Sequence, residues 1–571
     1  MHPRNPYRTP IDFTALAEAY PPLQLYLIQT ANGHHTLDFG NPEAQICLTK
    51  ALLHRDFGLD VQLTLERLCP PVPNRLNYIL WLQDIIAVTQ DETSGPVLGI
   101  DVGTGASAIY PLLGCATDAR WAFVATELDP LSLRFARENV ARNGLDKPHD
   151  ALKNTPYGPC PRIEILQASE DGPLLLPLVA YDRQFAFSMC NPPFYESAEE
   201  ISACAAGKAR PAVGARRVGS RGVARSSAAG SRQSTPGRQM EPGRRQSTPG
   251  SQNSAPASRH TTPGSRQSTP GPGLATALAG APVEMVTPGG ELAFVARMVV
   301  ESVRYGERCR WYTSMLGKLS SVAEIVRVLK EHGIDNYAIT ELVQGQTRRW
   351  AIGWSFTTLR LPDSLARVSS QALQSVLPSR NEMTQPLPQH IAVDTSWSTR
   401  VEAAVRDTCG ALPGVTVQAN AQTHALTISA TANTWSRAAR RKAHREATSK
   451  QSTPDHHVEL SLVVLVSWSA SGQEETEAPS ALEASTDAMD WENNGDGAPG
   501  DAAAEYAVEG RCRSTDSAMD VDNPLGAARI SLYHEATSPA LQIRWVRGKD
   551  RTLFETFWSH LSRKVVNILG Q

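Results

Sequence analysis

Four strand-like segments in the first third of the chain restrict the fold more than any other feature. They are "VLGIDV" from Val97, "WAFVATELD" from Trp121, "RIEILQA" from Arg162 and "FAFSMC" from Phe185. A helical pattern follows each of the first two segments, for example "PLSLRFARENVARNGL" after the second. Strands that alternate with helices in this way favour a parallel, doubly wound α/β sheet.

The fourth segment ends in Asn191-Pro192-Pro193-Phe194. Proline cannot donate a hydrogen bond to a strand ladder, so two prolines in succession end the strand. Asn191 is therefore expected at the carboxyl end of a strand, which is the rim where open α/β sheets bind ligands. A tight turn beside a core phenylalanine is the alternative for this segment taken alone.

A glycine turn, Asp-x-Gly-x-Gly from Asp101 to Gly105, follows the first segment. Glycine permits a tight turn and close approach of the backbone to a ligand, and the next helix is expected from about Ser107. The strand expected in the second segment ends at Glu127, 22 residues after Gly105. A carboxylate in that place can accept hydrogen bonds from both ribose hydroxyls of a nucleoside.

Two classes of enzyme use such a turn. A dinucleotide-dependent dehydrogenase prefers G-x-G-x-x-G, and Ala108 stands at the third position here. That interpretation leaves Asn-Pro-Pro-Phe unexplained. If the turn holds S-adenosylmethionine, the Asn191 side-chain oxygen and the Pro192 carbonyl can accept both N–H groups of a planar amine, and Phe194 can stack on a base. Adenine, guanine and a glutamine amide all remain open as the amine.

The length of the chain and its uneven charge indicate several domains separated by low-complexity stretches. With 571 residues it is too long for one core, so two to four domains are expected. Residues 207–273 hold twelve Lys and Arg against one acid and three copies of "RQSTPG". Residues 474–522 hold fourteen acids against two arginines. We predict both stretches to be disordered, because their low apolar content cannot offset the ordering entropy.

Cysteine usage and hydropathy exclude several classes of protein. The nine cysteines include no C-x-x-C pair, which predicts free thiols in a reducing compartment and no zinc or other metal site. The start "MHPRNPYRTP" lacks an apolar core and no run approaches 18 apolar residues. Secretion and membrane spanning are therefore not expected.

Two basic clusters favour an anionic partner over a protein substrate. One is "RAARRKAHR" at Arg437–Arg445, and the other joins "RCRW" to "RRW", with Arg308, Arg310, Arg348 and Arg349. A solvated face explains either cluster alone, but two clusters beside a base-methylating site indicate RNA. A non-catalytic RNA-binding adaptor is the further alternative, and the intact glycine turn and Asn-Pro-Pro-Phe argue against it.

Five segments together resemble a known family. They are "MHPRNPYRTPIDFTALAEAYP", "LLHRDFGLDVQLTLERLCPPVPNRLNYILWLQDII", "GIDVGTGASAIYPLLG", "MCNPPFY" and "RCRWYTSMLGK…QGQTRRWAIGWSF". These segments resemble the methyltransferase-like protein 16 family of U6 spliceosomal RNA N6-adenosine methyltransferases, over most of residues 1–200 and 283–356. The closing "LQIRWVRGKDRTLFETFWSHLSRKV" resembles the end of that family's C-terminal RNA-binding region more weakly.

The resemblance implies a Rossmann-like class I S-adenosylmethionine-dependent methyltransferase fold with an N-terminal extension, plus a smaller C-terminal α+β RNA-binding domain. It implies S-adenosylmethionine as the cofactor and methyl transfer to N6 of adenine in a structured RNA, with U6 small nuclear RNA as the partner. A monomer in the nucleus is expected, with the cytoplasm as a second compartment.

The expected site residues combine the motifs with the resemblance. Catalytic roles are expected for Asn191, Pro192, Pro193 and Phe194. Cofactor contacts are expected at Arg75, Gly103, Gly105, Ser107, Glu127, Ser169, Asp171 and Asn191, of which Arg75, Ser169 and Asp171 rest on the resemblance alone. RNA contacts are expected at Arg4, Arg8, Arg308, Arg310, Arg348 and Arg349. The chain departs from the family at Pro6, at Tyr195 and in the long insertion 207–273.

The expected domain boundaries follow from these differences in composition and charge along the chain, together with the resemblance. We expect an N-terminal RNA-binding extension at 1–80, a methyltransferase domain at 81–206 and 274–360, a disordered basic insertion at 207–273, a linker at 361–390, and a C-terminal α+β domain at 391–571 with a disordered acidic insertion at 472–524.

Overall fold

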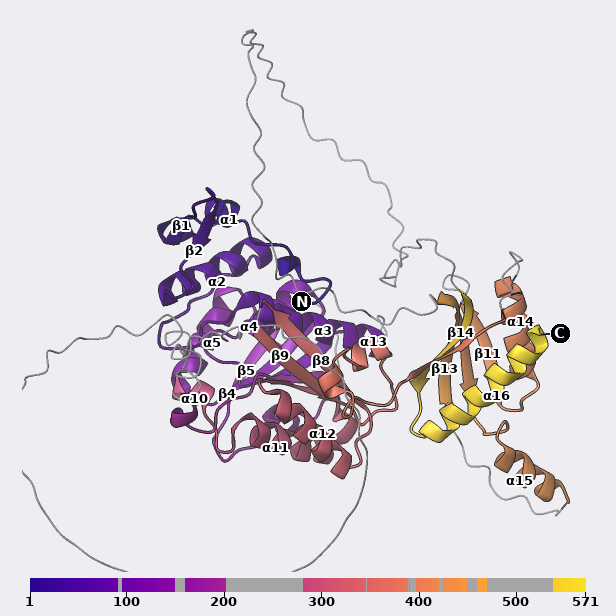
Figure 1. Ribbon diagram of the computed structural model, residues 1–571. Coiled ribbons are helices and arrows are strands. Elements are labelled where there is room, and N and C mark those ends of the chain that lie inside the picture. The colour runs from indigo at the N-terminus through magenta and orange to yellow at the C-terminus, as the bar shows by residue number, and fades with distance from the viewer. Residues whose placement is uncertain are drawn as a thin grey trace, which may run out of the picture.

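The computed structural model describes most of the chain outside its two low-complexity regions. The described residues are 1–90, 95–148, 160–201, 281–345, 347–388, 390, 397–420, 425–448, 460–469 and 538–570. The predictions of disorder at 207–273 and 472–524 lie outside the described residues. Figure 1 shows a larger body that carries the amino terminus and a smaller one that carries the carboxyl terminus.

A seven-stranded sheet forms the centre of the larger body. Its strands are β3 (Val97–Val102), β4 (Trp121–Glu127), β5 (Ile163–Gln167), β6 (Phe185–Cys190), β7 (Cys309–Leu316), β8 (Tyr337–Gln344) and β9 (Thr347–Trp354). The spatial order is β5-β4-β3-β6-β7-β9-β8. The first five strands in this order run parallel, and β9 runs antiparallel to both of its neighbours. The predicted parallel, doubly wound sheet is confirmed.

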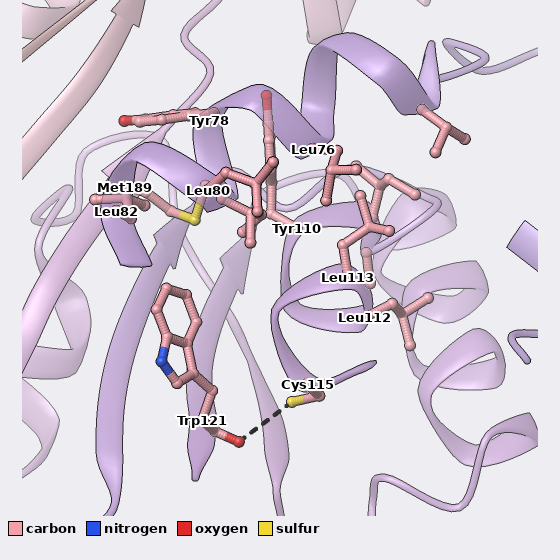
Figure 2. Packing of buried hydrophobic residues seen from close by; sticks show 14 of the residues in the cluster. Leu76, Tyr78, Leu80, Leu82, Tyr110, Leu112, Leu113, Cys115, Trp121 and Met189 are labelled. Atoms are coloured by element: carbon pink, nitrogen blue, oxygen red, sulfur yellow. Dashed lines mark hydrogen bonds between the residues drawn. The ribbon is translucent and has the colours of Figure 1, made fainter. Parts of the chain in front are cut away.

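Helices cover both faces of this sheet, so the larger body has two hydrophobic cores (Figure 1). The first face carries α3 (Val72–Thr89), α4 (Ile109–Thr117) and α5 (Pro130–Arg142); the second carries α7 (Leu176–Ala180), α11 (Gly290–Tyr305) and α12 (Leu319–Glu331). Figure 2 shows the first core, where Tyr78 of α3 lies above Met189 of β6; the Tyr78 ring centroid is 5.7 Å from that of Tyr110 in α4. Both faces of the strands are therefore apolar, as is usual in parallel sheets.

One glycine in the sheet is required by packing. A Cβ at Gly99 in β3 would lie 2.4 Å from Cζ of Phe187 in β6. The Phe187 ring is fully buried and also contacts Trp121 at a centroid distance of 4.7 Å. A side chain at Gly99 would displace this ring from the core.

The amino-terminal segment packs into the first core. It forms η1 (Pro6–Arg8), α1 (Phe13–Ala19), η2 (Pro21–Tyr26), β1 (Leu27–Gln29), β2 (His35–Leu37) and α2 (Pro42–Phe57). Its buried residues, including Leu16 and Leu52, join the same cluster as Ile79 and Trp121. The boundary predicted at residue 80 falls inside α3 and is corrected, because α3 is one helix whose buried apolar residues, from Val72 to Ile86, join the same core as Leu16 and Trp121.

The smaller body is the predicted α+β domain. Its antiparallel sheet has the order β10-β14-β13-β12-β11. The strands are β10 (Glu382–Pro386), β11 (Val415–Asn420), β12 (Ala425–Ala430), β13 (Leu460–Ser469) and β14 (Ser538–Arg547), and the helices are α14 (Trp397–Gly410), α15 (Arg437–Thr448) and α16 (Arg551–Leu569). Buried residues of α14 and α16, such as Val405 and Phe557, form its core with the sheet.

Residues 361–390 are not the linker that the sequence predicts. They contain α13 (Asp363–Ala366), η5 (Gln371–Leu373) and β10, and β10 pairs with β14 along its whole length. The short strand "EMTQP" lacks apolar alternation, so its sequence gives no sign of a strand. Arg360, which precedes this stretch, contacts β14 of the smaller body. Its backbone N–H donates to the carbonyl of Val546 at 2.8 Å, and its guanidinium lies 4.3 Å from the Trp545 ring centroid.

Candidate active site

The carboxyl edge of the central sheet brings the predicted motifs together. Val102, the last residue of β3, pairs with Thr126 of β4 on one side and with Cys190 of β6 on the other. The residues that follow these strands, Gly103 and Asn191, therefore lie close to Glu127 at one edge. The sequence motifs form one site, as the parallel order predicts.

The glycine turn leaves space for a ligand. Gly103 and Gly105 have φ angles of 72° and 67°, which residues with side chains rarely adopt. No atom of the described residues lies within 4 Å of a Cβ built at Gly103, and the nearest to one at Gly105 is Oε1 of Glu284, at 3.9 Å. The turn therefore presents bare backbone to the space in front of the sheet.

Glu127 is held firmly at the end of β4. Its Oε2 accepts a hydrogen bond from the Gly105 backbone N–H at 2.7 Å, and its Oε1 accepts from the N–H groups of Leu128 and Asp129, both at 2.9 Å. Burial raises the pKa of Glu127, while these three bonds oppose the shift. Since each carboxylate oxygen has two acceptor positions, Oε2 keeps one for a ligand hydroxyl.

Asp101 is the most unusual acid of the site. It is fully buried, and neither carboxylate oxygen has a hydrogen bond of normal geometry among the described residues. Burial raises the pKa of Asp101 to about 7; the nearby Glu127 charge raises it further, whereas the Thr104 hydroxyl and Arg75 lower it. Buried polar groups are normally satisfied, so a buried carboxylate without partners and with a raised pKa is a candidate functional group.

Asn191 and Phe194 follow β6 at the same edge of the sheet. Oδ1 of Asn191 is buried and has no hydrogen-bond partner among the described residues. The Phe194 ring lies against Gly317, where a Cβ would approach Cδ1 of the ring to 2.8 Å, and the Arg349 guanidinium is 5.3 Å from the ring centroid. An unpartnered amide oxygen and an aromatic ring therefore follow β6 at the edge that carries the glycine turn.

One supporting residue, Glu291, escaped the sequence analysis. Glu291, buried at the start of α11, accepts hydrogen bonds from the backbone N–H groups of Gly317 and Lys318 at 2.6 and 2.9 Å. It thereby fixes the turn behind Phe194. The glycine after the strand "CRWYTSML" was the available signal for this close approach.

The remaining predicted cofactor residues lie at the same edge, and no observation tests their role. Arg75 is buried in α3 and donates to the Tyr110 hydroxyl at 3.1 Å. Ser107 is buried just before α4, while Ser169 and Asp171 are exposed after β5. Their assignment to the cofactor stays a prediction.

The predicted RNA contacts separate into two groups. Arg348 and Arg349 lie at the amino end of the antiparallel β9, which places them at the edge of the site. Arg308 and Arg310 lie at the amino end of β7 and therefore at the opposite edge. Arg310 donates to the Thr89 carbonyl at 3.1 Å, so the structure does not bring these two residues to the site.

The two amino-terminal arginines lie on or near the extension's contact with α3. Arg4 forms an ion pair with Asp84 and donates to the Leu80 carbonyl at 3.1 Å. Arg8 is exposed and donates to the Pro3 carbonyl at 3.4 Å. Arg4 is thus used to attach the amino terminus, and an RNA contact at either residue stays a prediction.

The topology and site define a class of protein. A seven-stranded sheet with one antiparallel strand, a glycine turn after its first strand and Asn-Pro-Pro-Phe after its fourth form a Rossmann-like class I S-adenosylmethionine-dependent methyltransferase fold. The open glycine turn and the unsatisfied Asn191 amide fit that cofactor and its amine acceptor. A family model described as "RNA methyltransferase" matches residues 1–235 and 251–358, so the chain belongs to this family.

Known relatives share this region. The chain is 33% identical to the RNA N(6)-adenosine-methyltransferase METTL16 of Homo sapiens, over 70% of this chain and 61% of the relative. It is 30% identical to the U6 small nuclear RNA (adenine-(43)-N(6))-methyltransferase of Schizosaccharomyces pombe, over 73% of this chain and 84% of the relative. The chain spans about three-fifths of the length of the first vertebrate relatives.

Solved structures also match. The human Mettl16 catalytic domain in complex with MAT2A 3′UTR hairpin 1 is 32% identical, with a TM-score of 0.44, over 62% of this chain and 95% of that one. The N-terminal domain of human METTL16 in complex with SAH is 31% identical, with a TM-score of 0.42, over 62% of this chain and 98% of that one.

Glu127→Ala is expected to weaken S-adenosylmethionine binding by about 1–3 kcal/mol, because the ribose loses an acceptor and the glycine turn loses its anchor at Gly105. Titration calorimetry measures the affinity. Glu164→Ala, an acid of the neighbouring β5 that accepts only from Tyr181 among the hydrogen bonds described, is the control and should bind normally. Equal affinity of wild type and Glu127→Ala would remove Glu127 from the cofactor site.

Proposed function

We propose that this chain transfers the methyl group of S-adenosylmethionine to N6 of adenine in a structured RNA, with U6 small nuclear RNA as the substrate. The observation that carries the proposal is the buried Oδ1 of Asn191, which has no partner among the described residues and lies beside the glycine turn. The proposal includes a monomer working in the nucleus, the compartment that a spliceosomal RNA implies.

When bound, the cofactor supplies an electrophilic methyl group on a sulfonium. The chain's own residues then have to present the amine. An exocyclic adenine amine is a poor nucleophile, because its lone pair is delocalised into the ring. The Asn191 Oδ1 and the Pro192 carbonyl accept its two N–H groups, which favours tetrahedral geometry at nitrogen and directs the lone pair at the methyl. No strong base is needed, since the product ammonium loses its proton readily to water.

Phe194 selects a flat acceptor. Its ring lies against Gly317, the Arg349 guanidinium is 5.3 Å from the ring centroid, and a flipped base can stack on an aromatic ring of this kind. Burial lowers the pKa of Arg349, with the Arg75 charge acting in the same direction, yet a guanidinium stays charged at neutral pH. A cation at this edge favours a substrate with phosphates on either side of the base.

The alternatives remain experimentally distinct. A glutamine-amide or guanine methyltransferase would use the same two acceptors, and an adaptor would bind RNA without turnover. Arg348 and Arg349 at the site edge favour RNA over a protein glutamine. The names of the relatives, RNA N(6)-adenosine methyltransferases and U6 RNA adenine methyltransferases, favour adenine over guanine.

Transfer of labelled methyl to separate acceptors tests the proposal. The full chain is incubated with methyl-labelled S-adenosylmethionine and either U6 RNA or an RNA-free protein extract. Label is expected on RNA. Label on protein alone would replace the proposal with glutamine methylation, and bound cofactor without transfer to either acceptor would support the adaptor.

The C-terminal domain offers a second surface for RNA. A hollow of about 1320 Å³ lies between α15, α16 and the turn after α14. Its basic lining residues are Arg440, Lys442, Arg445, His560 and Lys564. Burial lowers the pKa of His560, and the nearby cations Arg440, Lys564 and Arg563 lower it further. Two acids, Asp407 and Asp550, also line the hollow, so its four Arg and Lys side chains outnumber the acids, a balance that suits a phosphate backbone.

Neutralising Arg440, Lys442 and Arg445 together to alanine is expected to weaken U6 RNA binding. If each contacts one phosphate, the slope of log affinity against log salt should become less negative by about 2–3. Binding is measured at several salt concentrations. The control neutralises three exposed cations elsewhere, Arg304, Arg327 and Lys330 of α11 and α12. Equal slopes for the two triple variants would exclude α15 from the RNA surface.

A further inference from the structure

A short segment that follows the long insertion ties the site together. We call residues 281–290 the strap; it consists of α10 (Pro282–Met285) and the turn that leads into α11 (Figure 1). No residue of α10 is buried. Apolar packing therefore does not hold this helix, and its position depends on hydrogen bonds.

The strap pairs with the catalytic segment. The Tyr195 backbone N–H donates to the Met285 carbonyl at 3.0 Å, and the Thr287 N–H donates to the Tyr195 carbonyl at 3.0 Å. Tyr195 and Val286 form an isolated parallel bridge. Because Pro192 and Pro193 have no N–H to donate, this bridge is the first backbone pairing after β6 that fixes Phe194 and Tyr195.

Glu284 attaches the other side of the strap. Its Oε2 accepts from the Leu68 backbone N–H at 2.9 Å and from the Ala281 N–H at 3.0 Å. Leu68 itself is fixed, because the neighbouring Arg67 forms an ion pair with Asp129 at 2.7 Å, at the start of α5. Oε1 of Glu284 faces the glycine turn, 3.9 Å from a Cβ at Gly105.

We propose that Glu284 is a positioning residue for methyl transfer: by holding the strap to Leu68 across the site, it fixes Phe194 and Tyr195 at the acceptor position. The expected effect on the rate of methyl transfer rests on the proposed function, whereas the hydrogen bonds of Glu284 to Leu68 and Ala281 do not depend on it. Glu284 joins the segment before α3 to the strap, and the strap joins Tyr195. No other described side chain of α10 makes a hydrogen bond to the rest of the body.

Glu284 stabilises the position of the strap through a charge-assisted hydrogen bond from the Leu68 N–H to its carboxylate. Such a bond is stronger than one between neutral groups, and its loss frees a segment that has no apolar anchor. A glutamine keeps an oxygen that accepts from Leu68 but removes the charge. Glu284→Gln should therefore retain most of the positioning that Glu284→Ala loses.

The test combines hydrogen exchange with single-turnover kinetics on the full chain. Exchange of the Tyr195 and Thr287 amides is followed by mass spectrometry on short peptides, and methylation of U6 RNA is followed at saturating cofactor. Glu307→Ala is the control, since Glu307 is an exposed acid next to β7 at the opposite edge of the sheet.

Glu284→Ala should raise exchange at both amides about tenfold and lower the single-turnover rate about tenfold, with cofactor affinity within about twofold of wild type. Glu284→Gln should stay within about threefold of wild type in both measurements. Exchange in Glu284→Ala equal to that in Glu307→Ala would overturn the proposal, as would equal losses in the alanine and glutamine variants. If wild type fails to methylate RNA, the proposed function fails while the exchange data still decide the role of Glu284.

Discussion

Replacing Asn191 with alanine is expected to lower the rate of methyl transfer about a hundredfold to a thousandfold while leaving cofactor affinity close to wild type. The substitution removes an acceptor whose bond to the amine strengthens in the transition state, which is worth about 3–4 kcal/mol. It leaves β6 and its ladder intact, because the side-chain oxygen has no partner among the described residues. Single-turnover rates and calorimetry measure the two quantities.

A buried asparagine outside the site is the control. Asn336 lies before β8 at the opposite edge, where its side chain donates to the carbonyls of Thr357 and Leu359. Asn336→Ala should lower the free energy of unfolding more than Asn191→Ala does, with a smaller loss of rate. If Asn191→Ala keeps a rate within about threefold of wild type, Asn191 is not the amine acceptor.

Asp101→Asn is expected to stabilise the cofactor-free protein at alkaline pH. Burial raises the pKa of Asp101 from 3.8 to about 7, so the folded protein binds this proton more tightly than the unfolded chain. Protonated Asp101 therefore favours the folded state fully below pH 3.8, and that stability is lost as the pH rises through about 7. The complete loss corresponds to about 4 kcal/mol.

Denaturant unfolding at several pH values tests this expectation. At pH 8 the asparagine variant should exceed wild type in the free energy of unfolding by up to about 4 kcal/mol, and the difference should vanish toward pH 4. The control is Asp118→Asn, because Asp118 is partly exposed and paired with Arg120. A constant difference across this pH range would show that Asp101 does not carry a raised pKa.

Sequence patterns predicted the parts of the fold that depend on local chemistry. The strand predicted from Phe185 to Cys190 has the same bounds in the structure, because the apolar run that forms it is followed closely by two prolines. The glycine turn and Glu127 were also predictable, since the order of strands and helices places both at one edge. The sequence of the terminal helix α16 is amphipathic, and its apolar Phe554, Phe557, Leu561 and Val565 are the buried ones.

The rest depends on contacts between residues that are distant in sequence. Arg308 lies only 40 residues before Arg348, yet the two lie at opposite edges, because β7 and β9 run antiparallel. Glu284, which follows the long insertion, accepts a hydrogen bond from Leu68, which precedes it by 216 residues. Glu291 accepts from the N–H of Gly317, and Phe194 packs against that glycine. A single sequence carries no signal of these pairings. The strand β10 was missed for the same reason, since its pairing with β14 and not its own residues makes it a strand.

Nucleoside analysis of U6 RNA tests the central claim most directly. The RNA is incubated with the full chain and methyl-labelled S-adenosylmethionine, digested to nucleosides and examined by mass spectrometry, with Asn191→Ala in parallel. The account predicts label in N6-methyladenosine with wild type and at least a hundredfold less with the variant. Label in a methylated guanosine, or equal label in N6-methyladenosine with both proteins, would contradict it.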